Sequence, residues 1–437
     1  MAYPKLLSAC ISTTLGMSVL FSSPVAAQSW HTSTIQETGD REIEGYSQVG
    51  EVAQQSEIQQ PSNTTKEIKT FLDWCQNRDS LTPEAKHTVE VILEIIHVQD
   101  CQQAYQELLN QTSLNLSSPF FHTIEDISPL ASLTHLEELN LSFNSINDIT
   151  PLSSLVNLRV LRLNRATKNS SYNIVKYGET PLDLTPLGSL TNLQMLDLTG
   201  NVIIDLTPLN SLINLRVLFL STIGFHNSPP EVTAQYIHNI DLTPLSNLTN
   251  LQQLHIPRTP HIENFTPLSS LINLRLLNLR YSQAKDLTFL SDLTNLEVLN
   301  LDANEIKDIT PLSSLLELKE LSIYHNQIKD ITPLSALTKL QKLFLGSNKI
   351  KDVTPLSSLI NLQELELQEN QITNVAPLSS LQNLLVLDLS SNDIQDLTPL
   401  SSLNNLQLLH LYRYNFYITE SDQNCPLQIE YICVWDF

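Results

Sequence analysis

Apolar residues, mostly leucine, return along this chain at a nearly constant interval, with polar residues between them. The dipeptide Pro-Leu marks the interval, because it recurs at steps of 22 residues, interrupted by single steps of 23, 35 and 36. Phe289 replaces the proline once. One unit reads LxxLxLxxNxIxDITPLSSLxN, as in residues 318–339. The spacing predicts about thirteen copies of one structural unit over residues 112–412.

Each unit contains the pattern of a strand followed by that of a helical turn. Leu321 and Ile323 alternate with polar residues, which is the period of a short strand with one buried face. Thr332 and Pro333 predict a capped start of a short helical turn. No unit can bury its apolar face alone, so neighbouring units must stack. The sequence therefore predicts an α/β repeat solenoid with one continuous parallel sheet.

Two polar residues recur inside the unit. An asparagine ends the strand, and we expect its buried amide to satisfy backbone groups of the turn and to form a ladder from unit to unit. An aspartate precedes the helical turn, and it is interpreted either as part of a calcium or acid ladder or as a turn-capping carboxylate. We favour the cap, because a repeated turn needs a repeated cap. The aspartates are Asp148, Asp205, Asp308, Asp330, Asp352 and Asp396.

Residues 66–111 precede the repeats and have helical periodicity. Apolar residues fall at helical spacing in three segments, and Thr82 and Asp100 are capping residues before the second and third. Cys75 and Cys101 lie on the apolar stripes of the first and third segments. We therefore expect a helical N-terminal cap in which a disulfide joins the first helix to the third.

Four cysteines follow residue 27, and an even number in an exported chain indicates two disulfides. Three pairings are possible. One pair lies before the repeats and the other after them, so we predict Cys75–Cys101 and Cys425–Cys433. A metal site is the alternative, but neither pair has CxxC spacing. The second disulfide would staple a short C-terminal cap over residues 413–437.

Residues 1–27 are organised like a secretory signal peptide, with Lys5 before an apolar stretch and small residues up to Ala27. A membrane anchor and a lipid-modified Cys10 are alternatives. The apolar stretch is short and interrupted for an anchor, and it follows Cys10 instead of preceding it. We expect cleavage after Ala27, a disordered spacer over residues 28–65, and a mature chain that is secreted, periplasmic or at the cell surface, without membrane insertion.

The charge balance narrows the choice of partners. The chain has 24 Lys and Arg against 46 Asp and Glu, a formal charge of −22. This balance disfavours nucleic acid and anionic lipid. The motifs GxSxG, GxxxxGK[ST], HExxH and GxGxxG are absent from the sequence. We therefore expect no enzyme activity, no cofactor and no metal, with a hydrolase built on the solenoid as the alternative.

The unit resembles the leucine-rich repeats of bacterial internalins, and the similarity covers residues 112–412. Internalin-like proteins also place a helical cap before the repeats. The resemblance implies a right-handed, curved solenoid that binds a protein partner on its concave sheet face, and we expect a monomeric binding module. No LPxTG-type sorting signal is present, which departs from that family. A structural envelope or matrix component without a single partner is the alternative.

The middle of the array is irregular. Insertions occur near residues 164–183 and 221–241, and insertions often form loops on the binding face. Four expected asparagines are replaced by Ala166, Ile223, Thr259 and Ser282.

Aromatic and basic residues gather on the outward strand positions of these irregular units. We predict that they bind the partner, against the alternative of scattered surface side chains. They are Phe219, His255, Arg258, Arg280, Tyr281, Arg162 and Arg165. A second candidate is an acidic patch, for which a solvated surface is the alternative. It comprises Glu364, Glu366, Glu369 and Asp388.

Overall fold

The computed structural model describes residues 70–118, 123–166, 181–221, 240–259 and 262–411, and the strand at residues 433–434. The chain divides into two units, Met1–Thr65 and Lys66–Phe437, and the described residues all belong to the second. Several predictions fall outside the described residues. They concern the signal peptide, the spacer, most of both insertions, Ile223, and the C-terminal cap with Cys425.

Three α-helices and one 3₁₀ helix precede the sheet in the described part of the chain. They are α1 (Phe71–Gln76), η1 (Arg78–Ser80), α2 (Pro83–Ile95) and α3 (Cys101–Asn110). The Thr82 hydroxyl accepts a hydrogen bond from the Ala85 N–H, and the Asp100 carboxylate accepts one from the backbone of α3, so both predicted caps are confirmed. Thr70 and Asp73 form a capping box at the start of α1, which was not predicted from the sequence.

The predicted Cys75–Cys101 disulfide is confirmed, and it joins α1 to the first residue of α3 across a Cα–Cα distance of 5.6 Å. Hydrogen bonds connect the helices to the first repeat. The Thr88 hydroxyl donates to the Asp126 carbonyl at 2.7 Å, and His135 Nε2 lies 2.8 Å from the carbonyl of α3 residue Leu108.

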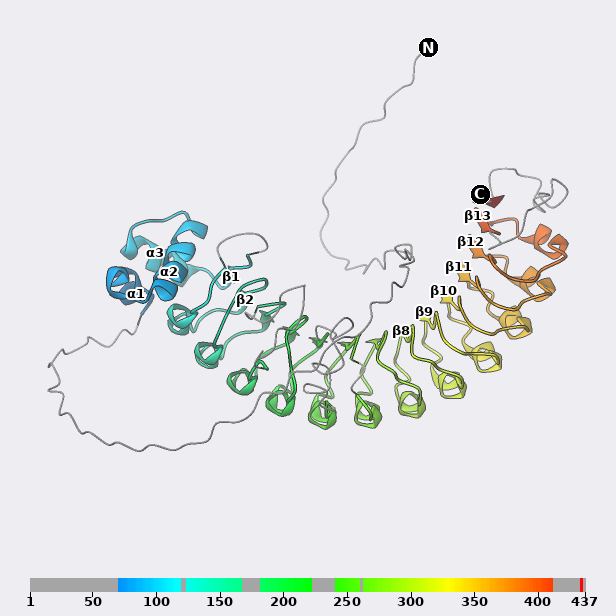
Figure 1. Ribbon diagram of the computed structural model, residues 1–437, viewed down its shortest axis with the longest axis horizontal. Helices are drawn as coiled ribbons and strands as arrows, with labels where there is room; N and C mark the ends of the chain where they lie inside the picture. Colours follow the sequence, from blue (N-terminus) through cyan, green and yellow to red (C-terminus); the bar gives the residue numbers. More distant parts are fainter. Residues whose placement is uncertain are drawn as a thin grey trace, which may run out of the picture. The chain divides into compact units, whose positions relative to one another are not determined.

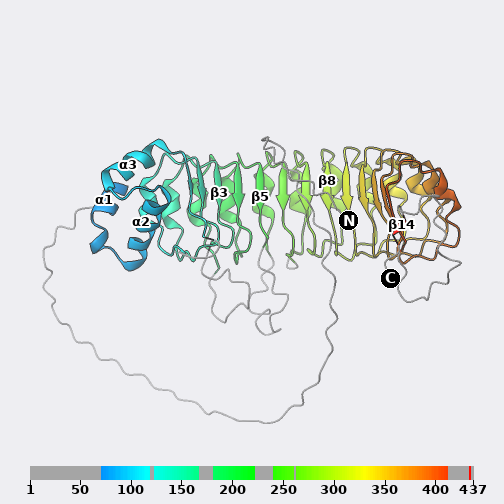
Figure 2. The same cartoon turned by 90° about the horizontal axis from the view of Figure 1, so that it is seen from above.

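The sheet consists of parallel strands that follow one another in sequence order. The strands are β1 (Ser113–Asn115), β2 (Glu138–Asn140), β3 (Val160–Arg162), β4 (Met195–Asp197), β5 (Val217–Phe219), β6 (Gln253–His255), β7 (Leu276–Asn278), β8 (Val298–Asn300), β9 (Glu320–Ser322), β10 (Lys342–Phe344), β11 (Glu364–Glu366), β12 (Val386–Asp388), β13 (Leu408–His410) and β14 (Cys433–Val434). Figure 1 shows the strands on the inner side of the curved array and the helical turns on its outer side. Figure 2 shows the strands side by side along the array. The predicted parallel solenoid is confirmed.

A 3₁₀ helix forms the helical turn of each repeat. These helices are η2 (Ser128–Ser132), η3 (Thr150–Ser154), η4 (Thr185–Ser189), η5 (Thr207–Ser211), η6 (Thr243–Asn247), η7 (Thr266–Ser270), η8 (Thr288–Asp292), η9 (Thr310–Ser314), η10 (Thr332–Ala336), η11 (Thr354–Ser358), η12 (Ala376–Ser380) and η13 (Thr398–Ser402). Proline occupies the first turn of most of them, where no N–H is needed. In η8, Phe289 takes this place, and its ring stacks on Phe265 with centroids 5.6 Å apart.

The recurring aspartate caps this turn, as we expected. The Asp330 carboxylate accepts a hydrogen bond from the Thr332 N–H at 2.9 Å, and the same bond occurs at the other five aspartates. Hydrogen bonds from the Thr332 side chain and backbone lower the pKa of Asp330. The capping group is thus the aspartate and not Thr332, which corrects the predicted role of that threonine.

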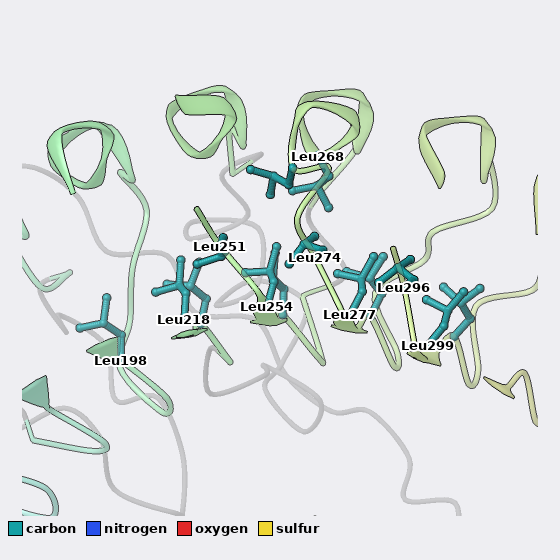
Figure 3. Packing of buried hydrophobic residues seen from close by; sticks show 14 of the residues in the cluster. Leu198, Leu218, Leu251, Leu254, Leu268, Leu274, Leu277, Leu296 and Leu299 are labelled. Atoms are coloured by element: carbon teal, nitrogen blue, oxygen red, sulfur yellow. The ribbon is translucent and has the colours of Figure 1, made fainter. Parts of the chain in front are cut away.

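Leucines form a continuous core between the sheet and the turns. In Figure 3, Leu218, Leu254, Leu277 and Leu299 follow one another from strand to strand. Each is fully buried. Every repeat has the same apolar side chains at equivalent positions. The leucines of one repeat therefore pack against those of the next and shield them from water.

The asparagine that ends each strand behaves as predicted in the regular repeats. Asn348 Nδ2 donates to the Ile323 and Leu345 carbonyls at 2.9 and 3.0 Å, and its Oδ1 accepts from the Ile328 N–H at 3.0 Å. Asn326 makes the corresponding bonds one repeat earlier. The buried amide therefore connects each turn to the preceding strand, and the predicted ladder is confirmed.

Candidate functional site

The concave face is built from the residues on either side of the central leucine of each strand. The leucine faces the core, and strand pairing places the residues after it in one continuous row. Arg162 of β3, Asp197 of β4, Phe219 of β5 and His255 of β6 occupy adjacent positions in this row. The structure thus brings three of the predicted partner-binding residues onto one surface.

Two of these residues form a stacked pair at the centre of the row. The Phe219 and His255 rings have centroids 4.3 Å apart and planes inclined by 17°. Phe219 is half-buried, whereas His255 is only 8% exposed. His255 is therefore more enclosed than its outward strand position predicts, because the phenyl ring lies against one of its faces.

Burial changes the chemistry of His255. Loss of hydration lowers its pKa from 6.5 to about 4, so the imidazole is neutral at pH 7. Its Nε2 atom is buried and has no hydrogen-bond partner among the described residues. An unpaired buried polar atom costs about 1–3 kcal/mol of stability. The surface therefore retains a polar group that destabilises the free protein.

Three predicted residues lie just after the strands in the left-handed backbone region. Arg165, Arg258 and Tyr281 have φ values of 48°, 60° and 58°. This conformation costs a residue with a side chain about 1–2 kcal/mol. Another repeat has Gly200 at the equivalent position, with a φ of 78°. Residues such as Ala303, Ser347 and Ser391 have the same positive φ at this position in other repeats, so the conformation is a property of the repeat turn and not of the candidate surface alone.

Arg280 and Tyr281 extend this surface beyond β7. The Arg280 guanidinium carbon lies 5.0 Å from the centroid of the Tyr281 ring, within the range of a cation–π contact. Arg280 Nε also lies 3.9 Å from the Asp302 carboxylate. Three strands separate β3 from β7, so the structure does not bring Arg162 into contact with this pair.

An apolar row beside these residues was not predicted from the sequence. It consists of the half-buried residues that precede the central leucines of β3, β4, β5, β7 and β8. They are Val160, Met195, Val217, Leu276 and Val298. The repeat register could have revealed them, because each stands one residue before a leucine of the core. In β9 to β11 the same position holds Glu320, Lys342 and Glu364, which interrupt the row. Half-buried apolar residues return at this position in β12 and β13, as Val386 and Leu408.

The predicted acidic patch is only partly assembled. Glu366 of β11 is aligned with Asp388 of β12, and Glu364 lies 3.2 Å from Lys342 Nζ. Burial raises the pKa of Glu366, and the negative charges of Asp388 and Glu364 raise it further, against a hydrogen bond from Gln368. Glu369 lies beyond the strand and accepts a hydrogen bond from the Ser347 hydroxyl.

The comparisons with known proteins agree with this architecture. A sequence profile for leucine-rich repeats in two copies matches residues 317–358 and 360–400, and a single leucine-rich repeat profile matches residues 132–149. An internalin of Listeria monocytogenes, InlF, is 30% identical and has a TM-score of 0.59; the match covers 79% of this chain and 98% of that one. The chain belongs to the internalin family.

Other solved structures share parts of this likeness. Internalin C2 of Listeria monocytogenes is 39% identical over 42% of this internalin-family chain and 75% of that one, with a TM-score of 0.38. The Arabidopsis receptor kinase HAESA, solved with a peptide hormone and a co-receptor, is 22% identical. Its match covers 70% of this chain and 50% of that one, with a TM-score of 0.54, and it shows the fold alone. A search of curated proteins gave no match.

No group of three or more His, Cys, Asp or Glu side chains is placed to hold a metal ion in the described ranges. No helix there is long and apolar enough to cross a membrane.

Hydroxyl groups replace two asparagines of the ladder in the irregular half. The buried Thr259 hydroxyl donates to the Ile256 carbonyl at 2.9 Å, and the Ser282 hydroxyl donates to the same carbonyl at 2.7 Å. Ala166 is fully buried and has no side-chain donor. A hydroxyl donates one hydrogen bond where an amide nitrogen donates two, so the turns next to the Phe219–His255 pair have fewer side-chain hydrogen bonds.

We expect Gly200→Ala to destabilise the protein by about 1–2 kcal/mol, because its φ is that of the left-handed region. An added Cβ would also lie 2.6 Å from Cγ of Arg165, one of the predicted binding residues. Urea denaturation of the parent and the variant measures the difference. Gly188→Ala is the matched control, because its added Cβ meets only ordinary contacts of 3.4 Å or more. Equal losses in both variants would contradict this account.

Proposed function

We propose that this internalin-family chain binds a protein partner on the concave face of β3 to β8. The observation that carries the proposal is the stacked Phe219–His255 pair, which combines aromatic surface with a buried unpaired nitrogen. Binding surfaces tolerate such costly groups because the partner recovers the energy on association. The HAESA structure supports the proposal by analogy of fold, since that protein was solved with a peptide hormone.

The surface favours a partner with an apolar centre and an acidic margin. The apolar row and the Phe219 ring supply the desolvated centre, where hot-spot residues are found in protein interfaces. Arg162, Arg258 and Arg280 surround it with guanidinium groups that pair with carboxylates. The rigid sheet adds little ordering cost on association. The acidic patch at Glu364 and Glu366 is the second candidate surface for binding a partner.

We also propose that the chain works as an exported monomer, without cofactor or catalysis. The Cys75–Cys101 disulfide supports an oxidising compartment, where such bonds persist. Secretion or surface display after cleavage at Ala27 accords with this chemistry.

The test is capture of exported and surface proteins by the mature chain, beside a variant with Phe219→Ala, Arg258→Ala and Tyr281→Ala. We expect the variant to bind the captured partner at least about 100-fold more weakly, because central aromatic and arginine residues contribute most of the affinity of an interface. Calorimetry with the purified partner measures the change.

The matched control changes equivalent positions outside the proposed surface, with Phe344→Ala in the row at β10 and His325→Ala at the turn after β9. This variant should retain the affinity of the parent. Loss in the control with retention in the first variant would move the site to the second half of the array. Equal binding by all three proteins would refute the concave-face proposal.

A further inference from the structure

A polar groove lies along the edge of the solenoid where the chain enters the strands, which we call the entry edge. Its volume is 810 Å³. Asparagines from four successive repeats line it, together with the residue that stands two positions after each of them, and His135 and Glu137 occupy the equivalent positions of the preceding repeat. These asparagines are Asn157, Asn192, Asn214 and Asn250. The residues two positions after these asparagines are Arg159, Gln194, Arg216 and Gln252.

The asparagines of the entry edge hold the groove in a fixed shape. Asn157 Nδ2 donates to the Thr134 carbonyl at 2.8 Å, and Asn192 Nδ2 donates to the Val156 carbonyl at 2.9 Å. Asn214 and Asn250 make the same bond to the preceding repeat. Each amide uses one N–H in this ladder, and its oxygen and second N–H have no hydrogen-bond partner among the described residues.

Two positions of the entry edge alternate in character from one repeat to the next: the residue before the asparagine and the residue two positions after it. The two positions change in step. Over residues 134–341, repeats with an aliphatic residue before the asparagine position have a basic residue two positions after it: Val156 with Arg159, Ile213 with Arg216, Ile272 with Arg275, and Leu316 with Lys319, where Glu317 replaces the asparagine. Repeats between them have threonine and an uncharged or acidic residue: Thr191 with Gln194, Thr249 with Gln252, Thr294 with Glu297, and Thr338 with Gln341. The entry edge therefore repeats every two coils over this stretch, and the pattern ends at the following repeat, where the aliphatic Ile360 is accompanied by Gln363.

The aliphatic members of this pattern have no part in the core. Ile213 and Ile272 are 53% and 52% exposed, and Val156 is 43% exposed. Polar residues occupy the same position in the intervening repeats, so packing does not require an aliphatic side chain there. The alternation is thus a property of the surface.

The guanidinium groups are open to solvent. Arg216 has no ion pair among the described residues, and Arg159 is only 3.6 Å from the exposed Glu137. Arg275 pairs with Glu297 at 2.5 Å, and Lys319 pairs with the same carboxylate. Exposed pairs of this kind contribute little and exchange readily. Arg159, Arg216 and Arg275 therefore form a row of solvent-exposed basic side chains on a chain of net charge −22, with Glu137 and Glu297 beside its two ends.

Spacing and chemistry together identify the ligand class. Strands in a sheet lie about 4.8 Å apart, so the two-coil repeat places one guanidinium about every 10 Å. One disaccharide of an extended polysaccharide has a similar length. Guanidinium groups bind carboxylates through paired hydrogen bonds, and free amides match hydroxyl and acetamido groups. Exposed aliphatic side chains can cover the C–H faces of sugar rings.

We propose that the entry-edge groove binds a linear polysaccharide with one carboxylate per disaccharide, of the type that alternates a uronate with an N-acetylhexosamine. One positive charge for every two coils matches one negative charge for every two sugars. Densely charged polyanions fit poorly, because the surrounding negative charge of the chain repels them. The site lies outside the concave surface proposed above, and neither proposal depends on the other.

The experiment measures binding of hyaluronan decasaccharide and unsulfated chondroitin decasaccharide to the mature chain by calorimetry. The test variant is Arg159→Gln, Arg216→Gln and Arg275→Gln, which gives these repeats the residue that neighbouring repeats already have. We expect the parent to bind both probes and the variant to bind at least about 10-fold more weakly, with retained melting temperature, because three charge-assisted contacts are lost.

A matched control removes three exposed lysines elsewhere, with Lys307→Gln, Lys329→Gln and Lys351→Gln. It changes net charge equally and should keep the affinity of the parent. Equal loss in this control would reduce the effect to overall charge and overturn the proposal. So would tighter binding of heparin, equal binding of a neutral chitin oligosaccharide, or tighter binding of a poly-glutamate peptide, which would indicate an acidic peptide instead. Absence of binding of both probes to the parent would refute it outright.

Discussion

Asn348→Ala is expected to lower the free energy of unfolding by about 3 kcal/mol. The substitution leaves the buried Ile328 N–H without its partner. It also removes one of the two amide donors from the Ile323 and Leu345 carbonyls, which keep their bonds from Asn326 and Asn370. An unpaired buried N–H costs about 1–3 kcal/mol, and each of the two lost carbonyl bonds adds about 0.5–1.5 kcal/mol, of which local relaxation recovers part. Urea denaturation followed by circular dichroism measures the loss.

The chain offers a matched control for this substitution. Asn361 is an exposed entry-edge asparagine, and its Nδ2 donates one hydrogen bond to the Thr338 carbonyl at 2.8 Å. Asn361→Ala should cost less than about 1 kcal/mol, since water replaces the lost donor. In a repeat protein the damage is expected to remain close to the altered coil. Amide exchange should therefore accelerate near Ile328 and Leu345 in the first variant; equal costs in the two variants would contradict the ladder argument.

The repeat period determined the core of this fold from the sequence. A leucine that recurs every 22 residues meets the same neighbours in every coil, so one assignment of buried positions applies to the whole array. The same argument located the buried asparagines and the aspartate caps. Register also survives the long steps: Phe219 and His255 are 36 residues apart in the chain and adjacent in the sheet.

Surface features were harder to predict because the period does not constrain them. The enclosure of His255 depends on the rotamer of one neighbouring phenylalanine, which no pattern specifies. Similarly, Asn157 reads as an ordinary polar residue in sequence, and its bond to the Thr134 carbonyl appears only when consecutive coils are stacked. The apolar row beginning at Val160 was predictable in principle, since register alone assigns it to the concave face.

His255→Phe should stabilise the protein, and by more in acid than at neutral pH. The substitution removes the unpaired Nε2 atom and keeps a ring against Phe219, so we expect a gain of about 1 kcal/mol at pH 7. The pKa of His255 falls from 6.5 to about 4 on folding. Above pH 6.5 the imidazole is neutral in both states and adds no pH dependence.

As the pH falls from 6.5 towards 4, His255 becomes protonated in the unfolded chain but stays neutral in the folded protein. The free energy of unfolding of the parent therefore decreases. The pKa difference corresponds to about 3 kcal/mol once the pH reaches 4, below which the loss stays constant. Urea denaturation at several pH values should show the gap between His255→Phe and the parent widening over this interval. His255→Gln should remove the same pH dependence without the gain of an apolar ring. A difference in free energy of unfolding that does not change with pH would mean that His255 is hydrated in the folded protein. Weaker partner binding by the more stable His255→Phe variant would show that the buried nitrogen is kept for recognition at the expense of stability.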